Sequence, residues 1–239
     1  MAVTVDIKKL LESGVHFGHK TSRWHPKMAP YIHSKRQDSH IIDLTKTVEG
    51  LDKALAFITE TVAGGKQVLL VGTKRQAQDL VKAAAKEVGQ PYVSERWLGG
   101  TLTNVATVGS QVKHLKLLER RMESGELANR YSKLEVQRFQ EEIDALNLKY
   151  GGIKSLDGQP GVVFVTDINA DANAVHEARK LNIPIVGLVD TNANPSQIDH
   201  VIPGNDDAIK GIQTILEYIK EAVKEGLAKQ KAAPPKEAK

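Results

Sequence analysis

Short apolar runs recur in the middle and second half of the chain, and they predict the strands of a sheet. They cover residues 68–73, 91–94, 161–167 and 184–190, and a shorter run lies around Val201 and Ile202. Because these runs are rich in Val, Ile and Leu without polar alternation, they are typical of strands buried on both faces of a parallel sheet.

Helical stretches alternate with these strands. They lie at residues 47–62, 75–88, 173–181 and 206–225. Gly89 and Pro91 end the second of these stretches, as glycine and proline commonly do just beyond a helix. The alternation of strand and helix predicts an α/β fold with a mostly parallel sheet.

Residues 104–150 break this alternation because they are too long for one crossover helix. A second helical stretch within them begins at a capping box formed by Ser132 and Glu135. In the first stretch, apolar residues step by three or four positions at Val105, Val108, Val112, Leu115, Leu118 and Met122. We therefore predict an inserted antiparallel two-helix coiled-coil hairpin, joined near residues 123–131.

These patterns predict the domain organisation. Residues 1–103 and 151–227 together form one α/β domain, in which residues 1–45 are a basic N-terminal arm and hairpin. Residues 104–150 are the coiled-coil insertion. Residues 228–239 are rich in Ala, Lys and Pro with almost nothing to bury, so we expect a disordered basic tail.

Composition excludes several classes of protein. The 239 residues are 41% hydrophobic and 26% charged, which is ordinary globular composition. No cysteine is present, which excludes disulfides, a thiol nucleophile and cysteine-ligated metals. The longest apolar runs are far shorter than the roughly 20 residues of a membrane span. Charged residues near the N-terminus, such as Asp6 and Lys8, do not fit a signal peptide, so we expect a cytoplasmic protein.

The distribution of charge is more informative than the net charge of +4. Residues 1–160 hold 24 Lys and Arg against 18 Asp and Glu, whereas residues 161–219 hold 3 against 8. Residues 13–37 contain no acid at all, and their basic side chains are Lys20, Arg23, Lys27, Lys35 and Arg36, with four histidines. This acid-free stretch indicates a face presented to a polyanion, and the alternative is a solvated basic surface.

Three candidate sites for chemistry are weaker. Residues 71–75 join a strand to a helix, where a phosphate could bind, but they lack the glycines of a phosphate loop. Lys74 and Arg75 could instead hold an RNA phosphate. Asp167 and Asp190 end two strands and could form a catalytic pair, although strand-end Asp more often caps the following loop. His16 and His19 have a spacing compatible with a metal, but no third ligand is evident, so we predict no metal site.

Each of the two tryptophans follows an arginine, in Arg23-Trp24 and Arg96-Trp97. An aromatic ring beside a guanidinium can stack on nucleic-acid bases. The alternative, which we favour for both rings, is a buried core anchor with the neighbouring arginine at the surface.

Several strings together resemble one known family. They are GVHFGH at 14–19, WHPKM at 24–28, YI at 31–32, IIDL at 41–44, VGTK at 71–74, RWLGGTLTN at 96–104, DTN at 190–192 and IPGNDDA at 202–208. In this order over about residues 5–225, they resemble the bacterial small-ribosomal-subunit protein two family. The nine-residue string at 96–104 is especially specific.

The resemblance implies a Rossmann-like parallel sheet with helices on both faces, the hairpin insertion, and no enzymatic activity, substrate or cofactor. It also implies a structural role in the cytoplasmic ribosome. There the protein would bind 16S ribosomal RNA between the head and body of the small subunit and contact neighbouring ribosomal proteins. It would also help recruit the large ribosomal protein that captures messenger RNA.

Matching strings and the acid-free stretch together indicate thirteen positions for RNA contact. They are His16, His19, Lys20, Arg23, Trp24, Lys27, Lys35, Arg36, Lys74, Arg75, Arg96, Trp97 and Asn104. Two alternatives remain at this point. One is a small-molecule enzyme that uses Asp167 and Asp190, and the other is a coiled-coil adaptor that binds proteins through the hairpin without RNA.

Overall fold

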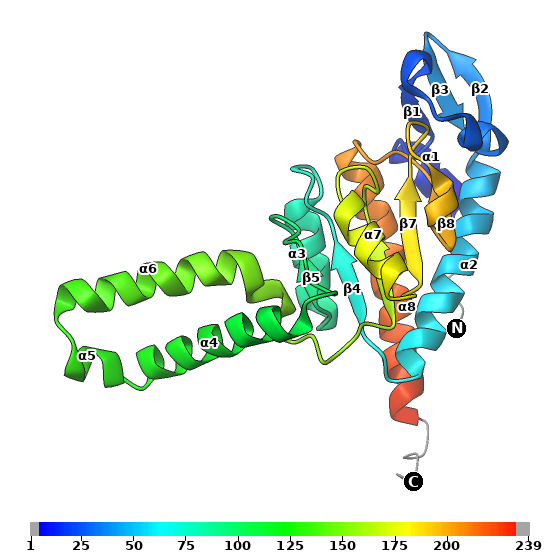
Figure 1. Ribbon diagram of the computed structural model, residues 1–239. Coiled ribbons are helices and arrows are strands. Elements are labelled where there is room, and N and C mark those ends of the chain that lie inside the picture. Colours follow the sequence, from blue (N-terminus) through cyan, green and yellow to red (C-terminus); the bar gives the residue numbers. More distant parts are fainter. Residues whose placement is uncertain (1–4, 233–239) are drawn as a thin grey trace.

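A computed structural model describes residues 5–232 (Figure 1). Its centre is a five-stranded sheet in the order β5-β4-β6-β7-β8, and every neighbouring pair is parallel. The strands are β4 (Val68–Val71), β5 (Tyr92–Val93), β6 (Val162–Val165), β7 (Ile185–Val189) and β8 (His200–Pro203). Each lies within or beside a predicted apolar run, so the α/β prediction with a parallel sheet is confirmed.

Helices cover both faces of this sheet because successive strand residues point to opposite sides. Leu70 and Phe164 pack with one group of helices, whereas Leu69 and Val163 pack on the face of α7. The first group consists of α2 (Leu44–Ala63), α3 (Gln78–Val88) and α8 (Ile209–Ala232), and α7 spans Ala172–Lys180. Figure 1 shows α7 and α8 on opposite sides of β7. This arrangement agrees with a Rossmann-like fold.

A small antiparallel sheet lies beyond the carboxyl ends of the parallel strands (Figure 1). Its order is β1-β3-β2, and it follows the short helix α1 (Ile7–Glu12). Its strands are β1 (Phe17–Lys20), β2 (Ile32–Arg36) and β3 (Ser39–Ile42), with the 3₁₀ turns η1 (Thr21–Arg23) and η2 (Pro26–Tyr31) between β1 and β2. We refer to residues 17–42 as the β-module. Most of the acid-free stretch therefore lies in one compact element.

Three helices occupy the region that interrupts the α/β alternation. They are α4 (Val105–Glu123), α5 (Glu126–Arg130) and α6 (Lys133–Tyr150), and the turn η3 (Gly151–Ile153) follows. The predicted capping box at Ser132 and Glu135 is present. Buried Leu115, Leu118 and Ile143 join α4 to α6, and Figure 1 shows the helices extending away from the sheet. Coiled-coil packing of this pair stays a prediction.

Several helix boundaries differ from the sequence-based expectation: α2 begins at Leu44 rather than at residue 47, and α8 begins at Ile209 rather than at residue 206. Helix α3 begins at Gln78 rather than at residue 75, because Lys74 and Arg75 form a turn closed by hydrogen bonds from the amides of Ala77 and Gln78 to the Lys74 carbonyl. Helix α8 continues to Ala232, so residues 228–232 of the predicted tail are helical. Ala and Lys are strong helix formers, and Lys229 pairs with Glu225 one turn earlier at 3.0 Å. The remaining tail, 233–239, lies outside the described residues.

Within residues 5–232, no helix has both the length and the apolar character needed to cross a membrane.

Candidate nucleic-acid interface

The β-module presents its basic side chains to solvent. Lys20 ends β1, Arg23 lies in η1, Lys27 lies in η2, and Lys35 and Arg36 end β2, all with exposed side chains. Trp24 lies among them and is 39% exposed, with its ring 5.3 Å from the His40 ring. The predicted burial of Trp24 is therefore wrong, and an aromatic surface accompanies the exposed cations.

Few acids neutralise these cations. Lys35 Nζ lies 3.5 Å from an Asp38 carboxylate oxygen, but both side chains are well exposed. Exposed ion pairs of this kind contribute little to stability. In the part of the chain that the structure describes, the other four cations of this group have no ion-pair partner. Their charge is available to an external anion such as a nucleic-acid phosphate.

The two histidines of β1 and its approach differ from the exposed cations. The ring of His19 lies between two carboxylates, with Nδ1 3.1 Å from Asp190 and Nε2 3.3 Å from Asp207. The hydrogen bond to Asp190 raises the pKa of His19 despite partial burial. The His16 ring packs on Phe17 at 4.1 Å, and burial lowers the pKa of His16. The two carboxylates therefore favour the protonated form of His19, whereas burial favours the neutral form of His16.

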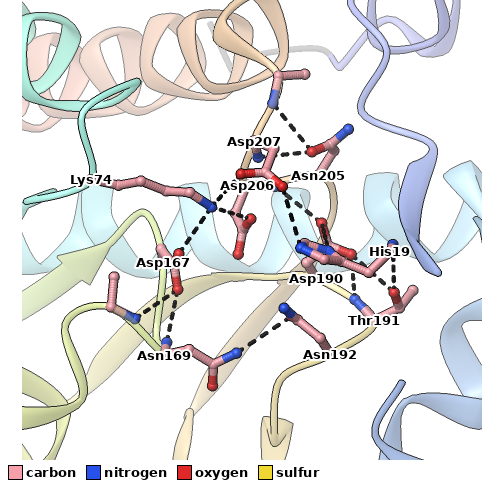
Figure 2. A network of polar contacts seen from close by, with 12 residues as sticks. His19, Lys74, Asp167, Asn169, Asp190, Thr191, Asn192, Asn205, Asp206 and Asp207 are labelled. Atoms are coloured by element: carbon pink, nitrogen blue, oxygen red, sulfur yellow. Dashed lines mark hydrogen bonds and ion pairs between the residues drawn. The ribbon is translucent and has the colours of Figure 1, made fainter. Parts of the chain in front are cut away.

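Lys74 is also engaged internally (Figure 2). Its Nζ lies 3.1 Å from Asp167, 2.7 Å from Asp206 and 2.6 Å from Asp207. Burial opposes the charge of Lys74, but hydrogen bonds with Asp206 and Asp207 outweigh it and raise the Lys74 pKa. Burial, together with the nearby charges of Asp167 and Asp190, raises the pKa of Asp206 to about 7. We call Lys74, His19 and these four aspartates the carboxylate cluster.

Asp167 and Asp190, which end two strands, accept hydrogen bonds from the loops that follow them. This is the capping role that we weighed against catalysis from the sequence. Asp167 accepts hydrogen bonds from the amides of Asn169 and Ala170 at 2.8 and 2.9 Å. Asp190 accepts hydrogen bonds from the amides of Thr191 and Asp206. These contacts and the ion pairs join the β-module to the loops that follow β4, β6, β7 and β8 at the carboxyl edge of the parallel sheet.

The possible cation ligands in the structure differ from the pair, His16 and His19, that the sequence spacing suggested. Ligand atoms of His19, Asp206 and Asp207 lie within 4.8 Å of one another, whereas His16 is not in this group. The spacing of His16 and His19 therefore does not bring them together on one ion. The Lys74 ammonium already contacts both of these carboxylates and supplies positive charge there.

Trp97, in contrast to Trp24, is the buried anchor that the sequence analysis favoured. It is 6% exposed, and its Nε1 donates a 3.0 Å hydrogen bond to Glu177 in α7. The same carboxylate accepts hydrogen bonds from the backbone amides of Gly100, Leu102 and Thr103. Sequence reasoning missed Glu177, although an acid on the face of α7 that also carries Ala174 and Ala178 was a detectable signal.

The remaining predicted positions lie apart from the β-module. Arg75 is exposed in the turn before α3, and Arg96 is exposed after β5. Neither has an ion-pair partner among the residues described. Asn104 caps α4, where its side chain accepts a hydrogen bond from the Thr107 amide at 3.3 Å.

Comparisons of this chain with a family model and with individual known proteins point to the same family. The family model described as ribosomal protein S2 matches residues 10–226. Three relatives, each named small ribosomal subunit protein uS2, come from Chloroflexus aggregans, a Roseiflexus species and Solidesulfovibrio magneticus. The first is 49% identical over 229 residues, covering 96% of both chains. The second is 50% identical over 222 residues, covering 93% of this chain and 84% of the relative.

The third relative is 49% identical over 231 residues, covering 97% of this chain and 89% of the relative. The match to the family model and these near-complete alignments cover the parallel sheet, most or all of the β-module and the region of α4 to α6. The chain therefore belongs to the ribosomal protein S2 family, whose members are structural proteins and not enzymes.

Proposed function

We propose that this protein binds 16S ribosomal RNA as a structural component of the small ribosomal subunit in the cytoplasm. The observation that carries the proposal is the β-module, where Lys20, Arg23, Lys27 and Arg36 are exposed without acidic partners beside exposed Trp24. Cations of this kind contact phosphates, and an exposed aromatic ring can stack on an unpaired base.

The thirteen indicated positions divide into two roles in this proposal. Direct contacts come from the exposed side chains, which are Lys20, Arg23, Trp24, Lys27, Lys35, Arg36, Arg75 and Arg96. Positioning comes from residues whose polar groups or rings are already engaged within the protein, which are His16, His19, Lys74, Trp97 and Asn104. Positioning residues hold the direct contacts in place without themselves touching RNA.

The test compares the salt dependence of binding to 16S ribosomal RNA. In the variant Lys20→Gln, Arg23→Gln, Lys27→Gln, affinity should fall and the slope of log affinity against log salt should flatten by about two to three. The matched control is Lys53→Gln, Lys180→Gln, Lys231→Gln, which removes three exposed charges from α2, α7 and α8. Each substitution should change the free energy of unfolding by no more than about 0.5 kcal/mol. Equal slopes for variant and control would overturn the role of the β-module.

We also propose that the protein helps recruit the large ribosomal protein that captures messenger RNA. Apolar side chains near the N-terminus support a protein-binding role, since Ile7, Leu11 and Phe17 are 46%, 53% and 51% exposed. Ile7 and Leu11 are four residues apart on α1, so they share one helix face. Leu11→Ser with Phe17→Ser should weaken capture of that protein by purified small subunits and leave the affinity for 16S ribosomal RNA unchanged. Unchanged capture would remove this patch from the proposal.

The region of α4 to α6 completes the proposed architecture. We propose that residues 104–150 are a coiled-coil insertion in an α/β domain made of residues 1–103 and 151–227. Support comes from the buried cluster that α4 and α6 share without any residue of the parallel sheet.

A further inference from the structure

A small cleft lies between the end of α6, the edge strand β5 and α3. Figure 1 shows α6 returning to the parallel sheet beside these two elements. Three basic side chains from three separate segments line the cleft. Lys82 comes from α3, Arg96 from the loop after β5, and Lys149 from the last turn of α6. Glu95 is the one acidic residue of this lining, so positive charge is in excess. We call this feature the elbow cleft.

The three cations are free to bind an anion. In the stretch that the structure describes, none of them has an ion-pair partner, whereas nearby Lys154 is held by Glu119 at 2.8 Å. Glu87 of α3 is likewise engaged by Lys220 and Lys224 of α8. Glu119 of α4 and Glu87 of α3 are therefore paired with lysines outside the elbow cleft.

The size of the elbow cleft restricts its ligand. Its volume is about 40 Å³, whereas a single enclosed water needs about 10–15 Å³ and small-molecule sites commonly span about 300–1,000 Å³. A phosphate-sized group fits this space, but a nucleobase or a nucleotide does not. Ser94 and Asn147 add polar side chains to the lining.

We propose that the elbow cleft binds one backbone phosphate of 16S ribosomal RNA, an inference that rests on the proposed function. A phosphodiester offers two charged oxygens, which suits cations that converge from several elements. Lys86 lies one turn beyond Lys82 on α3 and is exposed. It therefore adds a further cation, outside the elbow cleft, for the adjacent phosphate of the same strand. A row of cations matches a continuous RNA strand better than it matches a single carboxylate of a protein.

A phosphate in the elbow cleft would connect α6 to the parallel-sheet domain. The junction is already close, because a Cβ atom on Gly152 would collide with the carbonyl oxygen of Tyr92 in β5. Lys149 lies just before this junction, and Lys82 and Arg96 lie on the domain side of it. RNA bound here would therefore fix the direction in which α4 and α6 extend.

The first experiment measures affinity of the full chain for 16S ribosomal RNA at moderate salt. Lys82→Gln, Arg96→Gln, Lys149→Gln should weaken binding about 10- to 100-fold and flatten the salt slope by about one. The control Lys53→Gln, Lys180→Gln, Lys231→Gln carries the same change of charge. Lys82→Arg, Arg96→Lys, Lys149→Arg keeps the charges and should retain most of the affinity. Thermal melting of each variant shows whether its fold is intact.

The second experiment locates the RNA in assembled small subunits. Because the chain has no cysteine, Lys82→Cys, Lys149→Cys and Lys180→Cys each create a unique attachment point for a hydroxyl-radical probe. Probes at 82 and 149 should cleave the same segment of 16S ribosomal RNA, although their positions belong to different elements. The probe at 180 should not cleave that segment.

The outcomes separate this inference from the proposed function. If the parent chain binds RNA but the variant Lys82→Gln, Arg96→Gln, Lys149→Gln equals the control and neither probe cleaves RNA, the elbow cleft inference is overturned together with the direct contact proposed for Arg96. The proposed RNA binding through the β-module then stands. If the probes at 82 and 149 modify a neighbouring protein instead, the cleft binds an acidic protein segment and the inference is also overturned. If the parent chain does not bind 16S ribosomal RNA, both proposals fail.

Discussion

At the scale of single residues, the Glu177 carboxylate organises the segment that leads into α4. It accepts hydrogen bonds from the Trp97 ring and from the amides of Gly100, Leu102 and Thr103. Burial works against its negative charge, but these hydrogen bonds outweigh burial and lower the pKa of Glu177. A buried carboxylate with this many donors substitutes for the water that the donors would otherwise bind.

We predict that Glu177→Gln lowers the free energy of unfolding by about 2–4 kcal/mol. The NH₂ of the new amide would face N–H donors of the protein and could not accept their hydrogen bonds. Since the folded-state pKa lies below the unfolded value of about 4.3, the carboxylate stabilises the parent above that value and this stabilisation is lost as pH falls through the folded pKa. Urea denaturation at several pH values should therefore show the difference between parent and variant shrinking in acid. Exposed Glu141→Gln is the control, and a pH-independent difference would contradict the assignment.

The two tryptophans show what sequence can and cannot predict at this scale. Both occur as Arg-Trp, and for both the sequence favoured burial, yet Trp97 is buried and Trp24 is exposed. The difference depends on Glu177, which is 80 residues from Trp97 and supplies the hydrogen-bond acceptor that its indole needs when buried. A local pattern holds no information about such a distant partner.

At the scale of elements, periodicity predicted the helices and strands well because most of them bury apolar residues at regular spacing. The five parallel strands and the helices α2, α3, α7 and α8 all coincide with predicted stretches. Ends were less predictable, since α3 begins after a backbone-bonded turn at Lys74 that the spacing of apolar residues does not reveal. The antiparallel strands of the β-module, rich in His, Lys and Ser, have no comparable apolar pattern.

The outer part of the α4 to α6 region, residues 115–141, should be removable without loss of the parallel-sheet fold. His114 and Glu142 face each other across the two helices at 2.9 Å, so a linker of about four glycines can replace residues 115–141. Val108, Val112 and Tyr150 remain, and these residues pack against the parallel-sheet core. We expect the shortened chain to melt cooperatively with its sheet intact, because the sheet has its own core.

Circular dichroism and thermal melting of the shortened chain test this expectation. The helical signal should fall by an amount that matches the deleted segment, with a single transition retained. A chain without a cooperative transition would show that the outer hairpin is required for folding and would contradict the insertion. The elbow cleft is formed by residues outside the deletion, so binding of RNA there should persist.

At the scale of the whole molecule, the carboxylate cluster joins segments that are far apart in sequence. Lys74, Asp167 and Asp190 each follow a parallel strand, and the carboxyl ends of such strands share one edge, so their proximity was open to prediction. The contribution of His19 could not be predicted, because His19 reaches this edge of the sheet from the separate β-module. From the sequence alone, Lys74 was expected to contact RNA, and catalysis was one alternative for Asp167 and Asp190.

Neighbouring residues Lys74 and Arg75 give the last prediction, because their charges have different roles. Lys74→Ala removes the cation shared by three carboxylates and should lower the free energy of unfolding by about 3 kcal/mol, since Asp206 is left buried without its partner. Arg75→Ala removes an exposed charge and should change stability by no more than about 0.5 kcal/mol while weakening RNA binding.

Urea denaturation and RNA-binding salt series on both variants distinguish these roles. With Lys74→Ala, hydrogen exchange should accelerate in the β-module, because His19 and Lys74 share Asp207 and the module is anchored to the sheet through this cluster. Asp206→Asn added to Lys74→Ala should recover part of the stability by removing the uncompensated charge. If Lys74→Ala instead leaves stability unchanged and flattens the salt slope as Arg75→Ala does, Lys74 contacts RNA directly and its assignment as an internal cation is wrong.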